Sequence, residues 1–221
     1  MTTLTQPTVS KIIDRLFAEA DAAEARRSAD FSSARRAADP NDYLRYYAQL
    51  KDQPLPVSRD TGRLLYMLAR SIRAQNIVEF GTSFGISTLH LAAALRDNGG
   101  GRLIGSEFEP SKIKRAHESL AAAGLSDLVE IREGDALQTL ARNLPATIDF
   151  VLLDGAKTLY PSILSLLEGR LRNGALIVAD NADSSPDYLA RVRSATNGYL
   201  SVAFADDVEL SIRLGEERPN E

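Results

Sequence analysis

The sequence contains no cysteine and only two histidines. Without cysteine the chain can form neither disulfides nor a thiolate zinc site, and two histidines are too few for a site of the His-Glu-x-x-His type. No apolar run reaches the roughly 18 residues that a membrane-spanning helix needs, and the polar start Met1 to Pro7 lacks the core of a signal peptide. We therefore expect a soluble, cytoplasmic protein with no membrane partner.

An excess of basic charge is also missing, because 26 Lys and Arg residues stand against 30 Asp and Glu residues, for a net charge of −4. No general basic field would draw such a chain to nucleic acid, so the expected partner is a small molecule. The length of 221 residues and the hydrophobic fraction of 44% suit one α/β domain with an N-terminal extension better than two independent domains.

The stretch Ile77 to Leu95 carries the most informative motif. Its first residues are apolar and β-favouring up to Gly81, and Gly85 opens a segment with helical spacing, which predicts a strand, a tight turn and a helix. Gly81 lets the backbone approach a ligand, and Gly85 avoids a clash at the helix start. Because the spacing Glu-x-Gly-x-x-x-Gly differs from the dinucleotide fingerprint, we expect a nucleoside without a pyrophosphate. A βα turn without a ligand is the alternative.

An acidic residue follows the next expected strand, which runs from Arg102 to Ser106. In doubly wound folds such a residue holds ribose hydroxyls, since a carboxylate accepts two hydrogen bonds from a cis-diol. Glu107 is the first candidate for this role and Glu109 is the competing one. For both, a plain acidic residue at the N-terminus of the helix that begins near Pro110 is the alternative.

Two further apolar strands end on polar side chains. The run 148–153 ends at Asp154, and the run 175–179 ends at Asp180 and Asn181. The carboxyl ends of parallel strands lie along one edge of a sheet, so these three side chains are expected to converge. Two carboxylates and an amide oxygen are hard ligands that suit magnesium. The pattern therefore predicts a divalent cation site.

The N-terminal segment 1–53 is expected to be a helical extension of the domain formed by residues 54–221. Residues 9–38 favour a helix with one apolar face, and a second helix with three tyrosines follows the stop signal at residues 39–42. The Arg pairs at 26–27 and 35–36 form a solvated face or a binding patch, and the tyrosines pack between helices or cover a substrate. The extension is thus a lid or a dimerisation element, and we expect a homodimer.

These motifs resemble a known family. The glycine stretch resembles motif I of the class I methyltransferases that use S-adenosylmethionine, and Asp-Gly-Ala-Lys at 154–157 with Ala-Asp-Asn at 179–181 resembles the metal-dependent O-methyltransferases of the catechol and caffeoyl-CoA type. The resemblance covers about residues 54–214. It implies an α/β, Rossmann-like doubly wound fold, with a seven-stranded, mostly parallel sheet, a C-terminal antiparallel hairpin and N-terminal helices.

The resemblance also implies the cofactors S-adenosylmethionine and a divalent cation such as Mg²⁺. Lys157 is implied as the base that acts on the substrate hydroxyl, and a surface charge or a partner of one aspartate is its alternative role. The metal ligands implied are Asp154, Asp180 and Asn181. The cofactor contacts implied or expected are Val57, Ser58, Glu79, Gly81, Ser83, Ser87, Glu107, Asp135, Asp154 and Ala156. Helix capping is the alternative for Ser58 and Asp135.

The expected reaction is methyl transfer from a sulfonium to a hydroxyl of a small, aromatic vicinal diol by in-line displacement. Lys157 and Asp154 are the expected catalytic residues. Gly155 and Ala156 depart from the family, because the catechol enzymes carry a bulky pair there at the adenine wall. Two other functions fit the glycine turn and Glu107: a nicotinamide-dependent oxidoreductase, and a non-catalytic nucleoside-binding module that acts through the N-terminal helices.

Overall fold

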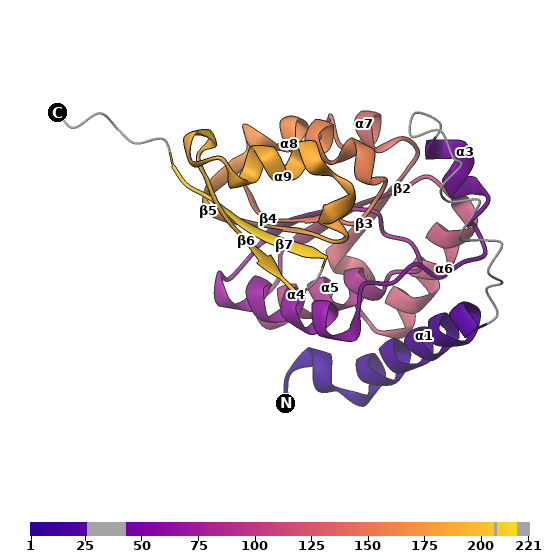
Figure 1. The fold of residues 1–221 in the computed structure, drawn as a ribbon. Coiled ribbons are helices and arrows are strands. Elements are labelled where there is room, and N and C mark those ends of the chain that lie inside the picture. The colour runs from indigo at the N-terminus through magenta and orange to yellow at the C-terminus, as the bar shows by residue number, and fades with distance from the viewer. Residues whose placement is uncertain (26–42, 206, 216–221) are drawn as a thin grey trace.

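The computed structural model describes residues 1–25, 43–205 and 207–215, and it places a seven-stranded sheet between two layers of helices (Figure 1). The strand order is β3-β2-β1-β4-β5-β7-β6, with β1 to β5 parallel and β7 antiparallel to both β5 and β6. The strands are β1 (Asn76–Phe80), β2 (Arg102–Glu107), β3 (Val129–Glu133), β4 (Ile148–Leu153), β5 (Leu171–Ala179), β6 (Tyr199–Phe204) and β7 (Val208–Arg213). The predicted fold class is confirmed.

The helices form a separate apolar core on each face of the sheet. One face is covered by α1 (Pro7–Ala25), α4 (Arg59–Ser71), α5 (Ile86–Asp97) and α6 (Pro110–Ala122), and the other by α7 (Ala136–Thr139), α8 (Tyr160–Glu168) and α9 (Pro186–Arg193). The shorter elements are η1 (Thr3–Thr5), α3 (Tyr43–Ala48), η2 (Ser126–Leu128), η3 (Lys157–Leu159), η4 (Ala182–Ser184) and η5 (Ala195–Asn197). In the part of the chain that the structure describes, no helix combines the length and apolar character needed to cross a membrane.

The order of the strands creates a crevice between β1 and β4. The chain proceeds from β1 outward to β2 and β3, and then returns to place β4 on the other side of β1. Phe80 pairs with Leu153, and Leu153 pairs with Ala179, so the carboxyl ends of β1, β4 and β5 are level. Ligands of doubly wound sheets bind at such a switch point. A ligand site is therefore expected beside the residues that follow these three strands.

The N-terminal helix α1 packs on the domain through the apolar face that its sequence predicts. Val9, Ile13, Leu16 and Phe17 are buried in the same core as α5. The preceding turn is also fixed, because the backbone N–H of Thr3 donates to the Asp97 carboxylate at 3.0 Å. The division at residue 53, the homodimer and the cytoplasmic location stay predictions.

Some sequence-based predictions concern residues outside those described. They are the continuation of the first helix to residue 38, the Arg pairs at 26–27 and 35–36, and the stop signal at 39–42. The side chains of Tyr46 and Tyr47 also lie outside the described part.

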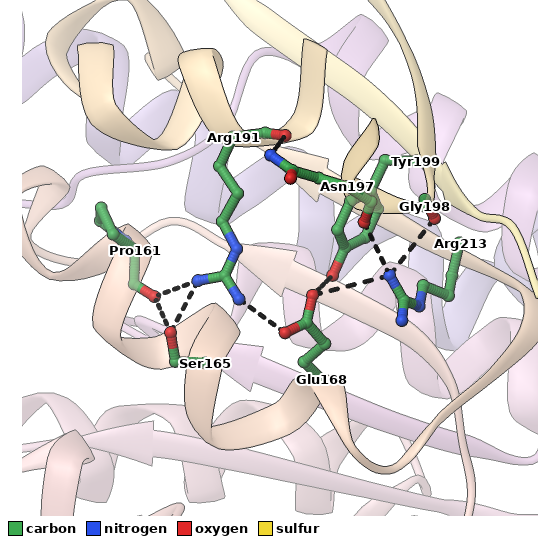
Figure 2. Close-up of polar contacts among 8 residues, drawn as sticks. All are labelled: Pro161, Ser165, Glu168, Arg191, Asn197, Gly198, Tyr199 and Arg213. Carbon is green, nitrogen blue, oxygen red and sulfur yellow. Dashed lines mark hydrogen bonds and ion pairs between the residues drawn. The ribbon is translucent and has the colours of Figure 1, made fainter. Parts of the chain in front are cut away.

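One carboxylate joins the C-terminal hairpin to helices α8 and α9 (Figure 2). Glu168 of α8 accepts hydrogen bonds of 2.6 Å from Arg191 of α9 and 2.6 Å from Tyr199 of β6. The guanidinium of Arg213 on β7 lies 3.6 Å from the same carboxylate. Both strands of the hairpin are thus fastened to the helical layer, which keeps β7 in place beside β5.

The packing of α4 on α5 generates a test of the core. Leu65 is fully buried on α4, whereas Met67 on the same helix is 64% exposed. Leu65→Ala should lower the free energy of unfolding by about 2–5 kcal/mol, because it removes buried methyl groups and leaves a cavity. Met67→Ala is the control and should change it by less than about 0.5 kcal/mol. Urea unfolding of both variants measures the difference, and equal losses would contradict the described packing.

Candidate active site

Two adjoining cavities lie at the carboxyl ends of β1 and β4. The larger contains about 590 Å³ of space and the smaller about 240 Å³. They share four lining residues, which makes them one cleft at the switch point of the sheet. The shared residues are Leu55, Gly81, Ser83 and Asp154. Apolar side chains also line the larger cavity, namely Tyr43, Phe80, Phe108, Ala136, Ala156 and Leu159.

The turn after β1 has the unusual backbone that its glycines predict. Gly81 has a φ of +100°, and a Cβ there would lie 2.4 Å from the carbonyl oxygen of Asp154, so no side chain fits. Ser83 also has a positive φ, of 48°. Its hydroxyl is buried without a hydrogen-bond partner in the described residues, and Ser83 lines both cavities. A bound ligand would supply the missing partner.

Glu79 lies behind this turn and lines neither cavity in the described structure. It is fully buried, and its carboxylate accepts hydrogen bonds from the hydroxyls of Ser87 at 2.6 Å, Thr88 at 2.6 Å and Thr82 at 3.2 Å. Burial raises its pKa to about 7. Ser87, by contrast, lines the smaller cavity. Glu79 thus orients Ser87 and the start of α5, and its contact with a cofactor stays a prediction.

Of the two acidic candidates after β2, Glu107 is the one in the cleft. Its carboxylate lines the larger cavity and accepts backbone N–H bonds from Ser83 at 2.8 Å, Phe108 at 2.9 Å and Glu109 at 3.0 Å. Glu109 instead caps α6 by accepting a bond from the N–H of Ser111 at 3.2 Å. The three donors fix Glu107 in one position at the cavity wall.

Asp135 is a helix cap, and it also lines the larger cavity, whereas its contact with the adenine stays a prediction. It caps α7 by accepting from the N–H of Leu137 at 3.0 Å, and it also lines the larger cavity, where the Tyr43 hydroxyl donates to it at 3.3 Å. Ser58 caps α4 through the N–H of Thr61 at 3.0 Å, and Val57 is buried. Neither Val57 nor Ser58 lines a described cavity, although the preceding linker residues do, so their cofactor contacts stay predictions.

The two aspartates after β4 and β5 come together, as the parallel strands predict. Asp154 and Asp180 lie close enough for each carboxyl group to influence the pKa of the other, and Lys157 Nζ lies 3.1 Å from Asp154 Oδ1. Burial raises the pKa of Asp154, although Lys157 opposes this effect. Burial and the charge of Asp154 raise the pKa of Asp180 to about 7. Two acidic groups close together in a largely buried place are an arrangement that a divalent cation would stabilise.

Asn181 is the third candidate ligand and follows directly, with a positive φ of 49°. Its Nδ2 donates to Asp207 at 3.0 Å, and this bond leaves the amide oxygen as the atom for another partner. No group of three His, Cys, Asp or Glu side chains able to hold a metal occurs in the residues described. A cation at this edge therefore needs the amide oxygen of Asn181 or ligands from solvent and substrate.

Phe80 on β1 occupies the space beside Gly155, the first of the small residues after Asp154. A Cβ at Gly155 would lie 2.4 Å from the ring of Phe80, which lines the larger cavity. The ring of Phe80 in turn meets Tyr160 edge to face, with centroids 6.2 Å apart. The volume that a bulky residue would take at 155 is thus occupied by Phe80. Ala156 lines the same cavity, as expected for the adenine wall.

Two residues of the site were missed by the reasoning from sequence. Lys112 of α6 is 4% exposed and lines the larger cavity. Its position four residues before the inward-facing Ala116 was a signal that its side chain shares the buried face. Tyr160 is fully buried, and its hydroxyl donates to the carbonyl oxygen of Asp180 at 2.8 Å. Nothing in the spacing of the sequence indicates that contact.

The doubly wound sheet with an antiparallel β7, and the cleft bordered by the glycine turn and by Glu107 at the end of β2, match the fold that the resemblance to methyltransferases implies. The family model described as O-methyltransferase matches residues 31–186, and the chain belongs to this family. The predicted resemblance is confirmed. Family membership favours a methyltransferase over the nicotinamide-dependent alternative.

The chain is similar to enzymes of both expected types. Catechol O-methyltransferase of Niastella koreensis is 37% identical over 130 residues, which cover 58% of this chain and 58% of that protein. Caffeoyl-CoA O-methyltransferase 1 of Eucalyptus globulus is 30% identical over 131 residues, which cover 58% of this chain and 52% of that protein. The match thus spans less than two thirds of the length of these relatives.

A solved structure supports the same fold. The O-methyltransferase TomG from Streptomyces achromogenes, which is involved in tomaymycin synthesis and was solved in complex with SAM, is 28% identical to this chain. The two superimpose with a TM-score of 0.64, and the match covers 87% of this chain and 98% of TomG.

The raised pKa of Glu79 predicts how stability depends on pH. The folded protein keeps this proton up to about pH 7, whereas the ordinary pKa of a glutamate side chain, as in the unfolded chain, is 4.5. The contribution of the Glu79 carboxyl to the free energy of unfolding is fully present below pH 4.5, and it is lost as the pH rises through 7. Relative to Glu79→Gln, which does not titrate, the wild type should lose on the order of 3 kcal/mol between pH 4 and pH 8.

Urea unfolding at several pH values measures this difference. Glu118→Gln, an exposed substitution on α6, is the control and should follow the wild type. Parallel profiles for the wild type and Glu79→Gln would show that the buried carboxyl does not titrate as described.

The contact between Gly155 and Phe80 predicts a coupled pair of substitutions. Gly155→Ala should cost about 1–3 kcal/mol of stability, because the new methyl group overpacks against the ring. Phe80→Leu in the same chain should recover part of that loss, which gives a favourable coupling energy in a double-mutant cycle. Gly169→Ala is the control, since a Cβ there meets nothing within 4 Å. A coupling energy near zero would show that Phe80 does not occupy the space that a side chain at residue 155 would take.

Proposed function

We propose that the protein is an S-adenosylmethionine-dependent, divalent-metal-dependent O-methyltransferase that acts on a hydroxyl of a small, aromatic vicinal diol. The observation that carries this proposal is the proximity of the Asp154 and Asp180 carboxyl groups, with Lys157 Nζ 3.1 Å from Asp154, beside the cleft at the carboxyl ends of β1 and β4. Membership of the O-methyltransferase family supports it, as do relatives named for catechol and caffeoyl-CoA.

The two cavities suit the two parts of the cofactor. In the larger one, Glu107 would accept hydrogen bonds from the ribose, and the apolar wall that includes Phe108 and Ala156 would pack on the adenine. Asp135, which lines the same cavity, would accept from the adenine edge. In the smaller one, the hydroxyl of Ser83, which has no partner in the described residues, would bind the methionine part. Asp154 lines both cavities, so it would lie near the methyl group that is transferred.

The acidic edge positions the methyl acceptor. Asp154, Asp180 and the amide oxygen of Asn181 would hold a divalent cation, because all are hard oxygen ligands. A bound cation of this kind lowers the pKa of a hydroxyl that coordinates it. Lys157, whose Nζ lies 3.1 Å from Asp154 Oδ1, would accept the proton of the substrate hydroxyl in its neutral amine form, after its own extra proton has left to solvent. A vicinal diol fits this edge because its two adjacent oxygens can face the same cation.

Loss of the base and of the acidic pair tests the proposal. With tritiated S-adenosylmethionine, Mg²⁺ and a panel of catechols, Lys157→Met should lower kcat by about 10²- to 10⁴-fold, as expected for removal of a general base. Asp180→Asn should lower the rate similarly and raise the Mg²⁺ concentration needed for half-maximal activity. Chelation of divalent cations should abolish turnover of the wild type.

Asp187→Asn is the matched control, because this exposed aspartate lies on α9 outside the cleft and should leave the rate unchanged. Full activity of both Lys157→Met and Asp180→Asn would overturn the assigned roles. A wild type that binds S-adenosylmethionine but transfers no methyl group to any catechol would instead favour the non-catalytic nucleoside-binding module.

A further inference from the structure

Lys112 occupies a place that is unfavourable for a cation. It is the third residue of α6, where the helix macrodipole is positive, and it is 4% exposed. Burial lowers the pKa of its ammonium group. In the described residues, no hydrogen bond or ion pair joins its Nζ to another group, and Nζ lies 5.7 Å from the ring centroid of Phe84. Among the described residues, neither the burial of the charge nor its position at the helix start is therefore offset by a direct polar partner.

Several acidic side chains attract Lys112, but none of those described forms an ion pair with it. Its strongest attraction is to Glu107, followed by Glu109, Asp154 and Asp52. Three backbone N–H groups hold the Glu107 carboxylate in place, and it forms no ion pair with Lys112. Both side chains line the larger cavity. An ammonium and a carboxylate thus face the same space without touching.

The chemistry of this pair selects the kind of group that fits between them. A carboxylate accepts hydrogen bonds and an ammonium donates them, whereas a hydroxyl does both. A phosphate or other anion would suit Lys112 but would be repelled by Glu107 and Asp154. A neutral hydroxyl satisfies both sides at once.

We propose that Lys112 is a second ribose-binding residue, whose ammonium donates to a ribose oxygen of the cofactor while the proton of that hydroxyl is donated to Glu107. This inference rests on the proposed function, because it takes the nucleoside in the cleft to be S-adenosylmethionine. A bond to the ribose would offset the cost of burying the Lys112 ammonium in a cavity that must also accept a positively charged sulfonium.

Binding of S-adenosylhomocysteine, measured by calorimetry at neutral pH, tests the role of Lys112 without turnover or added metal. Lys112→Met keeps the length of the side chain and removes the charge. It should raise the Kd by about 10- to 100-fold, the usual effect of losing a hydrogen bond to a charged group. Lys114→Met is the control, because Lys114 is exposed on the same helix, and its Kd should stay within about twofold of the wild type.

Analogues of the ligand identify the bond itself. The 2′-deoxy and 3′-deoxy forms of S-adenosylhomocysteine should bind the wild type more weakly, and the loss for one of them should be at least about threefold smaller in Lys112→Met, because the two changes remove the same bond. Lys112→Gln, which keeps a donor, should bind with intermediate affinity and provides a second variant if Lys112→Met does not fold.

The outcomes separate this inference from the proposed function. A wild type that binds S-adenosylhomocysteine together with variants that bind it equally well would overturn the role of Lys112 alone. Equal losses for both deoxy analogues in the wild type and the variants would also overturn it. A folded wild type that does not bind S-adenosylhomocysteine would overturn both.

Discussion

The close approach of β1 and β4 at their carboxyl ends determines the geometry of the whole cleft. The N–H of Asp154 donates to the carbonyl oxygen of Phe80 at 2.8 Å, and there is no room for a side chain at Gly81. The backbone must therefore turn sharply at this point. The same turn places the N–H of Ser83 against the Glu107 carboxylate and leads into α5. The cavity wall at Glu107 and the acidic edge at Asp154 thus both depend on one contact between two strands.

Glu79 and Asp180 are buried near this edge and Asp154 is half-buried, and these carboxyl groups are stabilised in different ways. Burying a charge without a partner is costly. Glu79 is held by three hydroxyl donors, and burial keeps its proton up to about pH 7. Asp154 is paired with Lys157, whereas burial and the charge of Asp154 raise the pKa of Asp180 to about 7. Glu79 thus supports the fold, and the aspartate pair is the part that a cation would complete.

Residues at the ends of apolar strands were the most predictable part of the site. Asp154 and Asp180 converge because parallel strands that end together must bring their next residues to one edge. The choice between Glu107 and Glu109 needed the structure, since both follow the same strand and the local backbone decides which faces the cavity. Lys112 was not predictable in this way, because a lysine in an amphipathic helix usually lies in water.

The fixed carboxylate of Glu107 has a consequence for the thermodynamics of binding. Its three N–H donors come from the turn after β1 and from the segment that opens α6, so these two walls of the cleft are tied together before any ligand arrives. Little conformational entropy would remain to be lost at that wall if a nucleoside bound there as proposed, and affinity would depend on matching a preorganised surface. A ligand whose sugar has the wrong shape would then meet a wall that does not adjust to it.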